Sequence, residues 1–499
     1  IAFAIPGGGV RTIVLAQPLP TLSDETGATT IDGYTQPGSH PNTLAQLSDA
    51  AIRVQIKSTA VITPATLEAL HITSKGNTVR GLALFTFRRS IFAFGPAATD
   101  NVIAGNYIGT DAAGAYAAPA ASASGNGVEL SQGAARNRIG GAAPADRNVI
   151  SGNAKNGIAT FNGGTDHNVI LGNLIGLGPS GARLHNLSHG IDINSHSSYN
   201  AVGGDAAGQR NVVSGNDAEG VEVSHGQRTV GNQIIGNYIG TDVSGTRATP
   251  ETANGWHGVH IEDGPVDSLV ARNVVGNNKL GGISIDGFET GFYPVGNHVV
   301  GNRVGVSLDG TPIPNAKFGV QVADHSLHSR IGPDNVIAFN PIGVQIVGVD
   351  TDFNTITRNI IYGNTGLGID LEPVGATNPN DSNDADAGAD QGLNMPLIGK
   401  ATPFEVDGTT CVTCTVELFR ADGGAGKYGQ GKLFIGSAQA GSDGTFAAVV
   451  SQLAVGDYVT ATATDALGNT SEFALNVQVV AAPAPVERKP EVYLPIIQR

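Results

Sequence analysis

The sequence predicts an all-β protein: a right-handed parallel β-helix, a solenoid with three strands per coil, followed by a small immunoglobulin-like β-sandwich. Three observations support this prediction. A unit of about thirty-two residues repeats through the middle of the chain. Gly makes up 70 of the 499 residues and charged residues only 14%, which suits a turn-rich β-body. Short strand patterns parted by tight turns follow residue 395.

The repeat is clearest in residues 211–224, whose copies recur between residues 101 and 371. Each unit contains three short β-branched runs bounded by Gly, Asn and Asp, the pattern of three strands joined by tight turns. Such a unit cannot bury its inward face alone, so we expect about eleven or twelve coils to stack, each strand pairing with its equivalents above and below. At ~4.8 Å per coil, the rod is on the order of 55 Å long. The units open at Asn101, Asn137, Asn168, Asn200, Asn232, Asp267, Asn297, Ser329 and Asn354.

Two kinds of residue mark the corners of the coils. Glycine opens the third strand, and we expect one vertical file of glycines, since a residue without Cβ adopts unusual corner angles at low cost. Asparagine marks other corners, where we expect left-handed conformations and hydrogen-bonded ladders between coils. The glycines are Gly127, Gly157, Gly190, Gly220, Gly258, Gly282, Gly319, Gly343 and Gly368. The asparagines, which we interpret as structural, are Asn106, Asn153, Asn173, Asn216, Asn237, Asn277, Asn302, Asn340 and Asn364.

The composition divides the chain into five segments. Residues 1–100 form the first coils and a cap of the β-helix, and residues 101–375 the regular repeats. An acidic linker follows at 376–395. Residues 396–480 carry several strand patterns separated by Asp-Gly and Gly-Asn turns, which is typical of an immunoglobulin-like sandwich. A Pro-rich linker and a C-terminal strand make up 481–499.

The charge and hydropathy exclude several classes of partner. The net charge of −15 argues against nucleic acid or anionic lipid. No apolar run reaches the roughly twenty residues that a membrane-spanning helix requires. The opening residues, IAFAIPGGGV, lack a positively charged start and a Met, and we infer that a leader is removed or lies outside the numbering. The missing signal peptide therefore does not argue against export, and we expect an extracellular protein at the cell surface.

Several phrases of the sequence resemble a known group of proteins. They are the repeated N-x-I-x-G-N-Y-I-G-T-D and R-N-V-I-S-G-N, the stretch 31–37 and the Asp-rich segment 378–390. These resemble the secreted bacterial right-handed β-helix repeat proteins found in large surface polypeptides. Segments 411–419 and 492–497 are similar to the ends of exported proteins of green non-sulfur (Chloroflexi) bacteria. The resemblance implies the architecture but no single activity, because this coil serves polysaccharide lyases, hydrolases, adhesins and passive surface layers.

A polar strip on the third strands is the candidate catalytic site. Its expected outward residues, in coil order, are Glu129, Ala159, Asp192, Glu222, His260, Ser284, Gln321, Gln345 and Asp370. Beside the successive Asp192, Glu222 and His260 lie His189, Trp256, His257, Glu262 and Asp286. One carboxyl could protonate a leaving oxygen while another attacks or activates water, as glycan cleavage requires. The alternative is a solvated face that holds charges which cannot point inward. The strip lacks the Lys or Arg base of uronate lyases.

The acidic linker contains a pattern of oxygen ligands at alternate positions. Asp381, Asp384, Asp386 and Asp390 surround a glycine turn, as in a calcium loop. A bound calcium ion would fix the angle between the rod and the sandwich. A plain acidic linker is the alternative.

Cys411 and Cys414 are the two cysteines of the chain. A zinc site would need two further ligands of the usual kind, and a redox pair would need a helix start that the surrounding strand pattern does not offer. In an exported protein a structural disulfide is favoured, provided that the chain turns enough to bring the two Cα atoms within about 7 Å.

The C-terminal segment presents a short apolar strand: Val492, Tyr493, Leu494, Ile496 and Ile497. It suits addition to a sheet edge, either of its own sandwich or of a neighbouring subunit, where an open first or last coil would accept it. The regular stack, the low charge and the absence of a convergent catalytic set make the leading expectation a non-enzymatic structural protein whose copies assemble into, or decorate, a surface filament or layer. The alternative is a carbohydrate-active enzyme, a glycoside hydrolase or polysaccharide lyase, or a glycan-binding adhesin, that uses Asp192, Glu222 and His260 on a cell-surface glycan.

Overall fold

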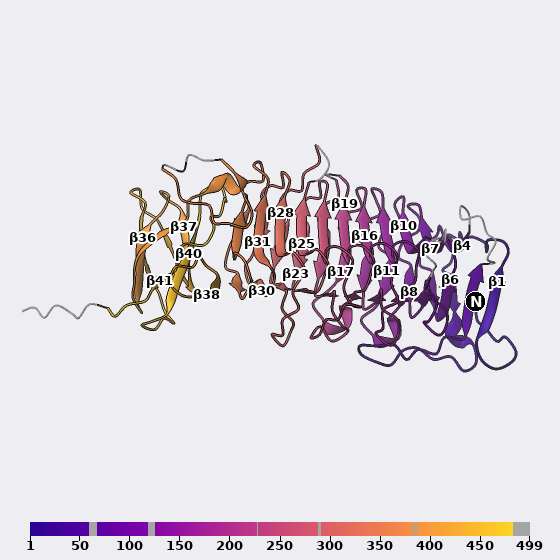
Figure 1. Ribbon diagram of the computed structural model, residues 1–499. Helices are drawn as coiled ribbons and strands as arrows, with labels where there is room; N and C mark the ends of the chain where they lie inside the picture. Colours follow the sequence, from indigo (N-terminus) through magenta and orange to yellow (C-terminus); the bar gives the residue numbers. More distant parts are fainter. Residues whose placement is uncertain are drawn as a thin grey trace, which may run out of the picture.

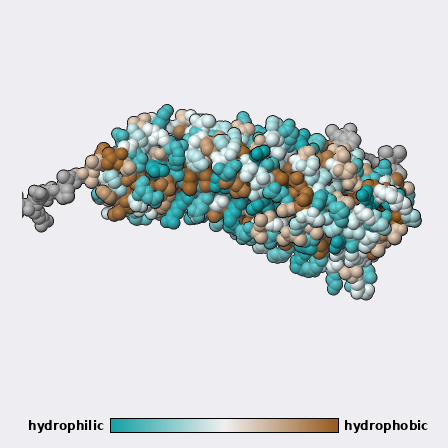
Figure 2. Space-filling view, turned by 90° about the horizontal axis from the view of Figure 1, so that it is seen from below, coloured by the Kyte–Doolittle hydropathy of each residue, from teal (hydrophilic) through white to brown (hydrophobic). Residues whose placement is uncertain are grey.

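The computed structural model describes residues 1–58, 67–117, 125–226, 228–287, 291–382, 384 and 387–482. It is an all-β rod in which the strands of successive coils lie side by side, with antiparallel strands at its C-terminal end (Figure 1). The predicted fold class, a parallel β-helix with three strands per coil, is confirmed. Seen from below, the surface of the rod mixes hydrophilic and hydrophobic residues along its length (Figure 2).

Three parallel sheets form the walls of the rod. The first sheet contains β1 (Arg11–Leu15), β3 (Val54–Ser58), β6 (Leu82–Phe85), β9 (Tyr107–Ile108), β12 (Val149–Ile150), β15 (Leu174–Ile175), β18 (Val212–Val213), β21 (Tyr238–Ile239), β24 (Val274–Val275), β27 (Arg303–Val304), β30 (Val336–Ala338) and β33 (Ile360–Tyr362). The second contains β2 (Thr30–Asp32), β5 (Thr78–Arg80), β8 (Val102–Ala104), β11 (Arg138–Gly140), β14 (Val169–Leu171), β17 (Ala201–Gly203), β20 (Gln233–Ile235), β23 (Leu269–Ala271), β26 (His298–Val300), β29 (Arg330–Ile331) and β32 (Thr355–Ile356). The third contains β4 (Glu68–Ile72), β7 (Arg89–Phe94), β10 (Asn126–Ser131), β13 (Ile158–Phe161), β16 (Ile191–Asn194), β19 (Val221–Ser224), β22 (Val259–Glu262), β25 (Gly281–Asp286), β28 (Phe318–Ala323), β31 (Ile342–Val347) and β34 (Ile369–Leu371).

Inward side chains stack in columns because neighbouring strands pair in register. Ile158, Ile191, Val221, Val259 and Ile283 form one such column and are completely buried. Fully burying a side chain of this size stabilises a fold by roughly 1.5–3 kcal/mol. The columns of the three sheets meet in one continuous core that runs along the rod.

The predicted glycine file exists, but the expected reason for it is wrong. The backbone of these nine glycines does not lie in the left-handed region. The coils instead approach so closely that a Cβ has no room: one added to Gly190 would lie 2.7 Å from the carbonyl oxygen of Gly220, and one added to Gly220 would lie 2.6 Å from that of Gly258. The file is therefore required by the spacing of the coils, not by corner angles.

Asparagine side chains form three ladders, where a single kind was expected. In each ladder the side-chain oxygen of one Asn accepts a hydrogen bond from the side-chain amide of its equivalent one coil earlier, for example Asn216 to Asn254 at 3.0 Å. The first ladder contains Asn77, Asn101, Asn137, Asn168, Asn200 and Asn232. The second contains Asn106, Asn148, Asn173, Asn211, Asn237, Asn273, Asn302, Asn335 and Asn359. The third contains Asn153, Asn186, Asn216, Asn254, Asn278, Asn315, Asn340 and Asn364.

Several details of the predicted asparagine set are corrected. The set mixes members of the second and third ladders. Asn278, not Asn277, occupies the rung of the third ladder. Of the nine predicted asparagines, Asn277 has a left-handed backbone, with φ at 63°, while the other eight do not. In the file that opens the units, the backbone N–H of Ser268, not of Asp267, donates to Asn297 at 2.9 Å.

Two antiparallel sheets follow the rod and share one core. One contains β35 (Leu397–Ala401), β36 (Glu405–Thr409) and β39 (Thr445–Val449), and the other β37 (Thr415–Ala421), β38 (Gly431–Gln439), β40 (Tyr458–Thr464) and β41 (Val477–Gln478). They form a small β-sandwich, while its immunoglobulin-like topology stays a prediction. The helical elements of the described residues are short 3₁₀ turns: η1 (Gly33–Thr35), η2 (Pro144–Asp146), η3 (Ala207–Gln209) and η4 (Ala389–Gly392).

The sandwich and the preceding linker cover the last coil, so the expectation of an open coil at this end is wrong. Gln430 accepts from the amide of Asn364 at 2.9 Å and so ends the third ladder. Asp390 accepts from the backbone N–H of Asn354 at 2.9 Å. Glu417 accepts from the hydroxyl of Thr357 at 2.6 Å. These groups take the place of a further coil.

Candidate functional site

The candidate site lies on the outward face of the third sheet, at β16, β19, β22 and β25. The register places Asp192 beside Glu222, Glu222 beside His260 and His260 beside Ser284, as the repeat predicts. Asp192, Glu222 and His260 expose only 5%, 6% and 8% of their surface. This face is therefore not the solvated face considered as an alternative. Burial of so many ionisable groups is costly unless they pair with one another.

A second row of polar residues runs beside the first, and sequence reasoning missed its central member. His189, Glu219 and His257 each precede a glycine of the file, on successive coils. Glu219 is 1% exposed and lies between the two histidines. The pattern that could have found it is the position before the file glycine, which holds Asn126 and Asn156 on earlier coils.

His189 joins the two rows. Its Nε2 lies 2.8 Å from Oε2 of Glu222, and its Nδ1 lies 2.7 Å from Oε2 of Glu219. The contact with Glu219 is short but is not aligned as a hydrogen bond. Within the described part of the chain, neither Nδ1 of His189 nor Oε2 of Glu219 has a hydrogen-bond partner. His189 therefore lies in close contact with both carboxylates and holds them by charge.

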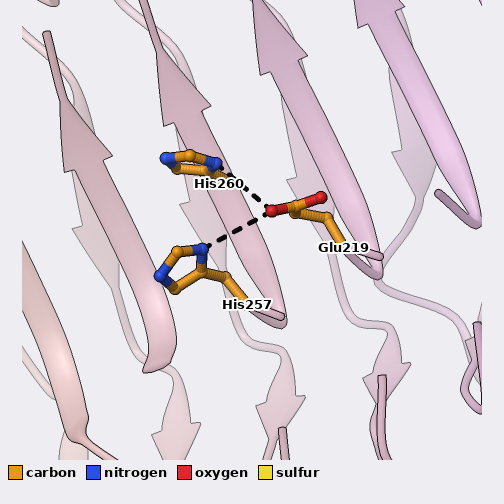
Figure 3. Close-up of side chains that lie close together, drawn as sticks. All are labelled: Glu219, His257 and His260. Carbon is orange, nitrogen blue, oxygen red and sulfur yellow. Dashed lines mark ion pairs between the residues drawn. The ribbon is translucent and has the colours of Figure 1, made fainter. Parts of the chain in front are cut away.

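The other oxygen of Glu219 faces two histidines. Oε1 lies 3.6 Å from Nδ1 of His257 and 3.6 Å from Nδ1 of His260, and the three side chains point toward one another (Figure 3). Both distances exceed those of a hydrogen bond. Counting all described residues, both oxygens of Glu219 and Nδ1 of His257 are buried without a hydrogen-bond partner. Oε1 of Glu219 and Nδ1 of each of the two histidines thus lie close together without a hydrogen bond between the carboxylate and either ring.

Asp286 orients His260 from the opposite side. Oδ2 of Asp286 accepts a hydrogen bond from Nε2 of His260 at 2.8 Å and another from the hydroxyl of Ser284 at 2.7 Å. Glu262 lies 3.5 Å from Nδ1 of His260. Since a carboxylate only accepts, the proton of this bond lies on Nε2 of His260.

The pKa values of the two central carboxyls move apart. Burial raises the pKa of Asp192 to about 7, and the charge of neighbouring Glu222 adds to the rise. Burial acts in the same direction on Glu222, but His189 outweighs it and lowers the pKa of that carboxyl. Asp192 also accepts a hydrogen bond from the amide of Asn156 at 2.9 Å. Near neutral pH Glu222 is therefore ionised, while Asp192 is protonated in a substantial fraction of the molecules.

The remaining ionisable groups of the cluster are shifted by the same two causes. Burial opposes the charge of His189, but contacts with Glu219 and Glu222 raise its pKa to about 10. Burial raises the pKa of Glu262 to about 8. For Glu219, burial favours the neutral form, yet the surrounding histidines lower the pKa of its carboxyl.

A pocket of about 820 Å³ adjoins this cluster on the N-terminal side of the same sheet. It shares Asn156, the residue that donates to Asp192. Its lining includes two kinds of side chain that bind sugars and anions, aromatic rings and cations: Phe92, Phe94, Phe161, Arg88, Arg89 and Lys155. Phe94 is 40% exposed and therefore offers a ring face to a ligand.

The other predicted site residues lie elsewhere. Trp256 is 52% exposed beside the cluster, where its backbone N–H donates to Ala218. Cys411 and Cys414 form the predicted disulfide, with Cα atoms 5.5 Å apart. Val492, Tyr493, Leu494, Ile496 and Ile497 lie outside the described residues, so their predicted role in assembly stays a prediction.

The predicted calcium loop is only partly described, because Asp386 lies outside the described residues. Asp384 accepts from the backbone N–H of Asn394 at 2.8 Å, and the backbone N–H of Asp381 donates to the Asn394 side chain at 2.9 Å. The two oxygens of Asp390 accept backbone hydrogen bonds from Asn354 and Thr470. Calcium binding stays a prediction.

No protein-family description and no curated protein matches the sequence. Among solved structures, the periplasmic alginate epimerase AlgG is similar, with 14% identity and a TM-score of 0.39 over 72% of this chain and 75% of AlgG. The enzymatically active domain of tailspike protein 2 of bacteriophage CBA120 has 9% identity and a TM-score of 0.25 over 91% of this chain and 72% of that one. A tailspike mutant of E. coli bacteriophage HK620, in complex with a pentasaccharide, has 11% identity and a TM-score of 0.24 over 94% and 87%. At these values the likeness is one of fold.

In the part of the chain that the structure describes, we find no helix with the length and apolar character needed to span a membrane.

Proposed function

We propose that the protein is a carbohydrate-active enzyme that cleaves a glycosidic bond at Asp192 and Glu222. The observation that carries the proposal is the in-register pair of buried carboxyls, one with a pKa raised to about 7 and the other with a lowered pKa. Two carboxyls whose environments separate their pKa values are the usual acid and base of glycoside cleavage.

The two carboxyls take complementary roles. Asp192 donates its proton to the glycosidic oxygen, and the bond between that oxygen and the anomeric carbon breaks. Neighbouring strands about 4.8 Å apart permit their side chains to take the roughly 5–5.5 Å separation of the carboxyls in retaining enzymes. Glu222 therefore forms the ester with the anomeric carbon, and a water molecule activated by Asp192 hydrolyses it. His189 keeps Glu222 ionised.

The adjoining pocket binds the sugar chain. Phe94 offers a ring on which a sugar can stack. Arg88, Arg89 and Lys155 bring three positive charges to this pocket of a chain whose net charge is −15, and Arg89 pairs with Glu129 at 2.7 Å and with Glu68 at 2.9 Å. We expect a glycan that carries carboxylate or other acidic groups, encountered outside the cell.

The test is reducing-sugar release from a panel of neutral and acidic polysaccharides. The wild-type chain should release sugar from at least one of them. D192N and E222Q should each release it on the order of 10²–10⁴-fold more slowly. E251Q changes an exposed carboxyl away from the site and should cleave as the wild type does. If the chain binds a polysaccharide but releases no sugar, the protein is a glycan-binding adhesin and not an enzyme.

The structural candidate, copies that assemble into a surface filament or layer, rests on the regular stack, the low charge and the absence of a convergent catalytic set in the sequence, with residues 492–497 as the strand that would join the copies. Those residues lie outside the described part of the chain. The buried, paired carboxyls favour the carbohydrate-active function, because a structural rod needs no ionisable groups in that position.

A further inference from the structure

We propose that Glu219, His257 and His260 bind a divalent transition-metal ion of the zinc type and leave one coordination position open. The site does not depend on the proposed glycan cleavage, because it rests on the arrangement of these three side chains alone. Glu219 reaches it from the turn before β19, His257 from the turn before β22, and His260 from within β22 (Figure 3).

The three ligand atoms have the spacing that a shared ion requires. Oε1 of Glu219 lies 3.6 Å from Nδ1 of each histidine, and the three atoms all lie within 4.8 Å of one another. At metal–ligand distances of about 2.0–2.1 Å, two tetrahedral ligands are separated by roughly 3.3 Å. The observed spacing is therefore too long for hydrogen bonds and close to that of ligands around one ion.

The buried polar atoms of the cluster lack partners that an ion would supply. The side chains of Glu219, His257 and His260 expose 1%, 12% and 10%. Both oxygens of Glu219 and Nδ1 of His257 make no hydrogen bond to any described residue. The charge of His189, 2.7 Å from Oε2, compensates that oxygen of Glu219. Oε1 of Glu219 and Nδ1 of His257 remain without a bonded partner among the described residues, and a buried polar atom in that state carries a desolvation cost. An ion bound by Oε1 and the two nitrogens would remove most of that cost.

The surroundings of His260 resemble the support given to metal-binding histidines. Asp286 accepts from Nε2 at 2.8 Å, so the other ring nitrogen, Nδ1, is the one that faces Glu219. Ser284 in turn donates to the same oxygen of Asp286. A carboxylate behind a metal-binding imidazole fixes its tautomer and orientation.

The donor set selects the kind of ion. Two imidazole nitrogens and one carboxylate oxygen suit zinc and neighbouring transition metals, whereas calcium and magnesium prefer oxygen ligands only. Three protein ligands with an open fourth position are typical of zinc sites that bind water or a substrate oxygen.

The experiment uses the tag-free full chain, stripped of metal with a chelator and titrated calorimetrically with ZnCl₂. We expect one saturable equivalent of zinc and a higher melting temperature in its presence. Cobalt added in place of zinc should give visible absorption bands of a four-coordinate site. X-ray absorption of the zinc-loaded chain should show imidazole nitrogens among its ligands.

Matched variants separate this site from others. E219Q and H257A should weaken zinc binding at least about 100-fold, and D286N, which changes only the support of His260, about 10–100-fold. E251Q and H298A change exposed residues outside the cluster and should bind as the wild type does. D192N should keep the site even though it loses the proposed cleavage.

Melting curves recorded in chelator show whether each variant is folded. If E219Q and H257A fail to fold, D286N and the absorption spectrum of the wild type decide. No saturable zinc binding, unchanged affinity in folded E219Q, or coordination by oxygen alone would overturn the proposal.

Discussion

Asp192 and Glu222 are chemically similar side chains that the fold makes different. They occupy equivalent positions on neighbouring strands and are buried to nearly the same extent. The difference comes from His189, which lies 2.8 Å from Glu222, while Asp192 accepts a hydrogen bond from the neutral amide of Asn156. A cation beside one carboxyl and an uncharged donor beside the other is enough to separate their pKa values.

The raised pKa of Asp192 makes a prediction about stability. Its carboxyl has an unperturbed pKa of 3.8 and a folded-state pKa of about 7, so the folded chain holds a proton that the unfolded chain releases between these values. The favourable contribution is complete below pH 3.8 and is lost as the pH rises through about 7. D192N carries no charge, so it should raise the free energy of unfolding at pH 8 by on the order of 1–4 kcal/mol.

Denaturant unfolding of D192N and the wild type at pH 4 and pH 8 measures this difference. At pH 4 the two chains should differ little, and E251Q should match the wild type at both values. Equal stability of D192N and the wild type at pH 8 would contradict the assigned protonation.

The outward row could be predicted from the repeat, but Glu219 could not. Strand alternation places Asp192 and Glu222 outward once Val221 and Val223 are placed inward. Glu219 lies before the strand begins, at a corner where alternation no longer fixes the direction of a side chain. Its burial depends on two histidines from the next coil, which only the three-dimensional structure brings close.

At the scale of single strands, buried amides set the stacking of the coils. Most strands are only two to six residues long, so their backbone hydrogen bonds alone fix the register weakly. The asparagine ladders add hydrogen bonds at each coil in a buried setting, where an unpaired amide is costly.

The third ladder makes a prediction that distinguishes adjacent residues. Asn278 accepts from Asn254 at 2.9 Å and donates to Asn315 at 2.9 Å. N278A removes both side-chain bonds, although Asn254 keeps its bond to the carbonyl of Val213 and Asn315 keeps the bond from the backbone N–H of residue 278. The variant should therefore cost roughly 1–3 kcal/mol of stability. Asn277 lies off the ladder with a left-handed backbone that glycine adopts readily, and its amide donates to the carbonyl of Thr249 at 2.7 Å in an exposed setting. N277G should therefore cost less than N278A, about 1 kcal/mol or less.

Thermal and denaturant unfolding of both variants provide the measurement. A cost for N277G as large as that for N278A would show that the rungs are assigned wrongly. Because the two asparagines are adjacent, the sequence period of about thirty-two residues predicts a ladder without deciding which of them enters it.

At the scale of the whole molecule, the sandwich closes the apolar end of the rod. Phe419 and Phe473 belong to the same buried core as the inward residues of the last coils. Gln430 and Glu417 satisfy backbone and side-chain donors of the last coil. This contact could not be predicted from the repeat, because the sandwich has no period in common with the coils.

Removing the sandwich should therefore expose the unpaired strands and apolar residues of the last coil, which can then pair with another copy of the chain. A chain that ends at residue 375 keeps the coils but uncovers Ile369, Leu371 and the amide of Asn364, so it should form dimers or larger aggregates. Size-exclusion chromatography with light scattering measures this, with a chain ending at residue 482 as the control, since it keeps the described contacts. A monomeric 1–375 chain with an unchanged melting temperature would contradict the closing role.

The ladder ends also bear on how such a chain can change length over generations. Gln430 and Asp390 recognise the last coil by its asparagines, and any internal coil presents the same groups to the coil after it. Duplicating or deleting one whole internal coil would therefore leave both ends fitted, whereas adding a coil after the last one would separate it from its cover. Proteins descended from one ancestor should therefore differ in length by whole repeats inserted between unchanged ends. Where a repeat is inserted before the site, the residue numbers of Asp192, Glu219 and Glu222 should all increase by the same amount.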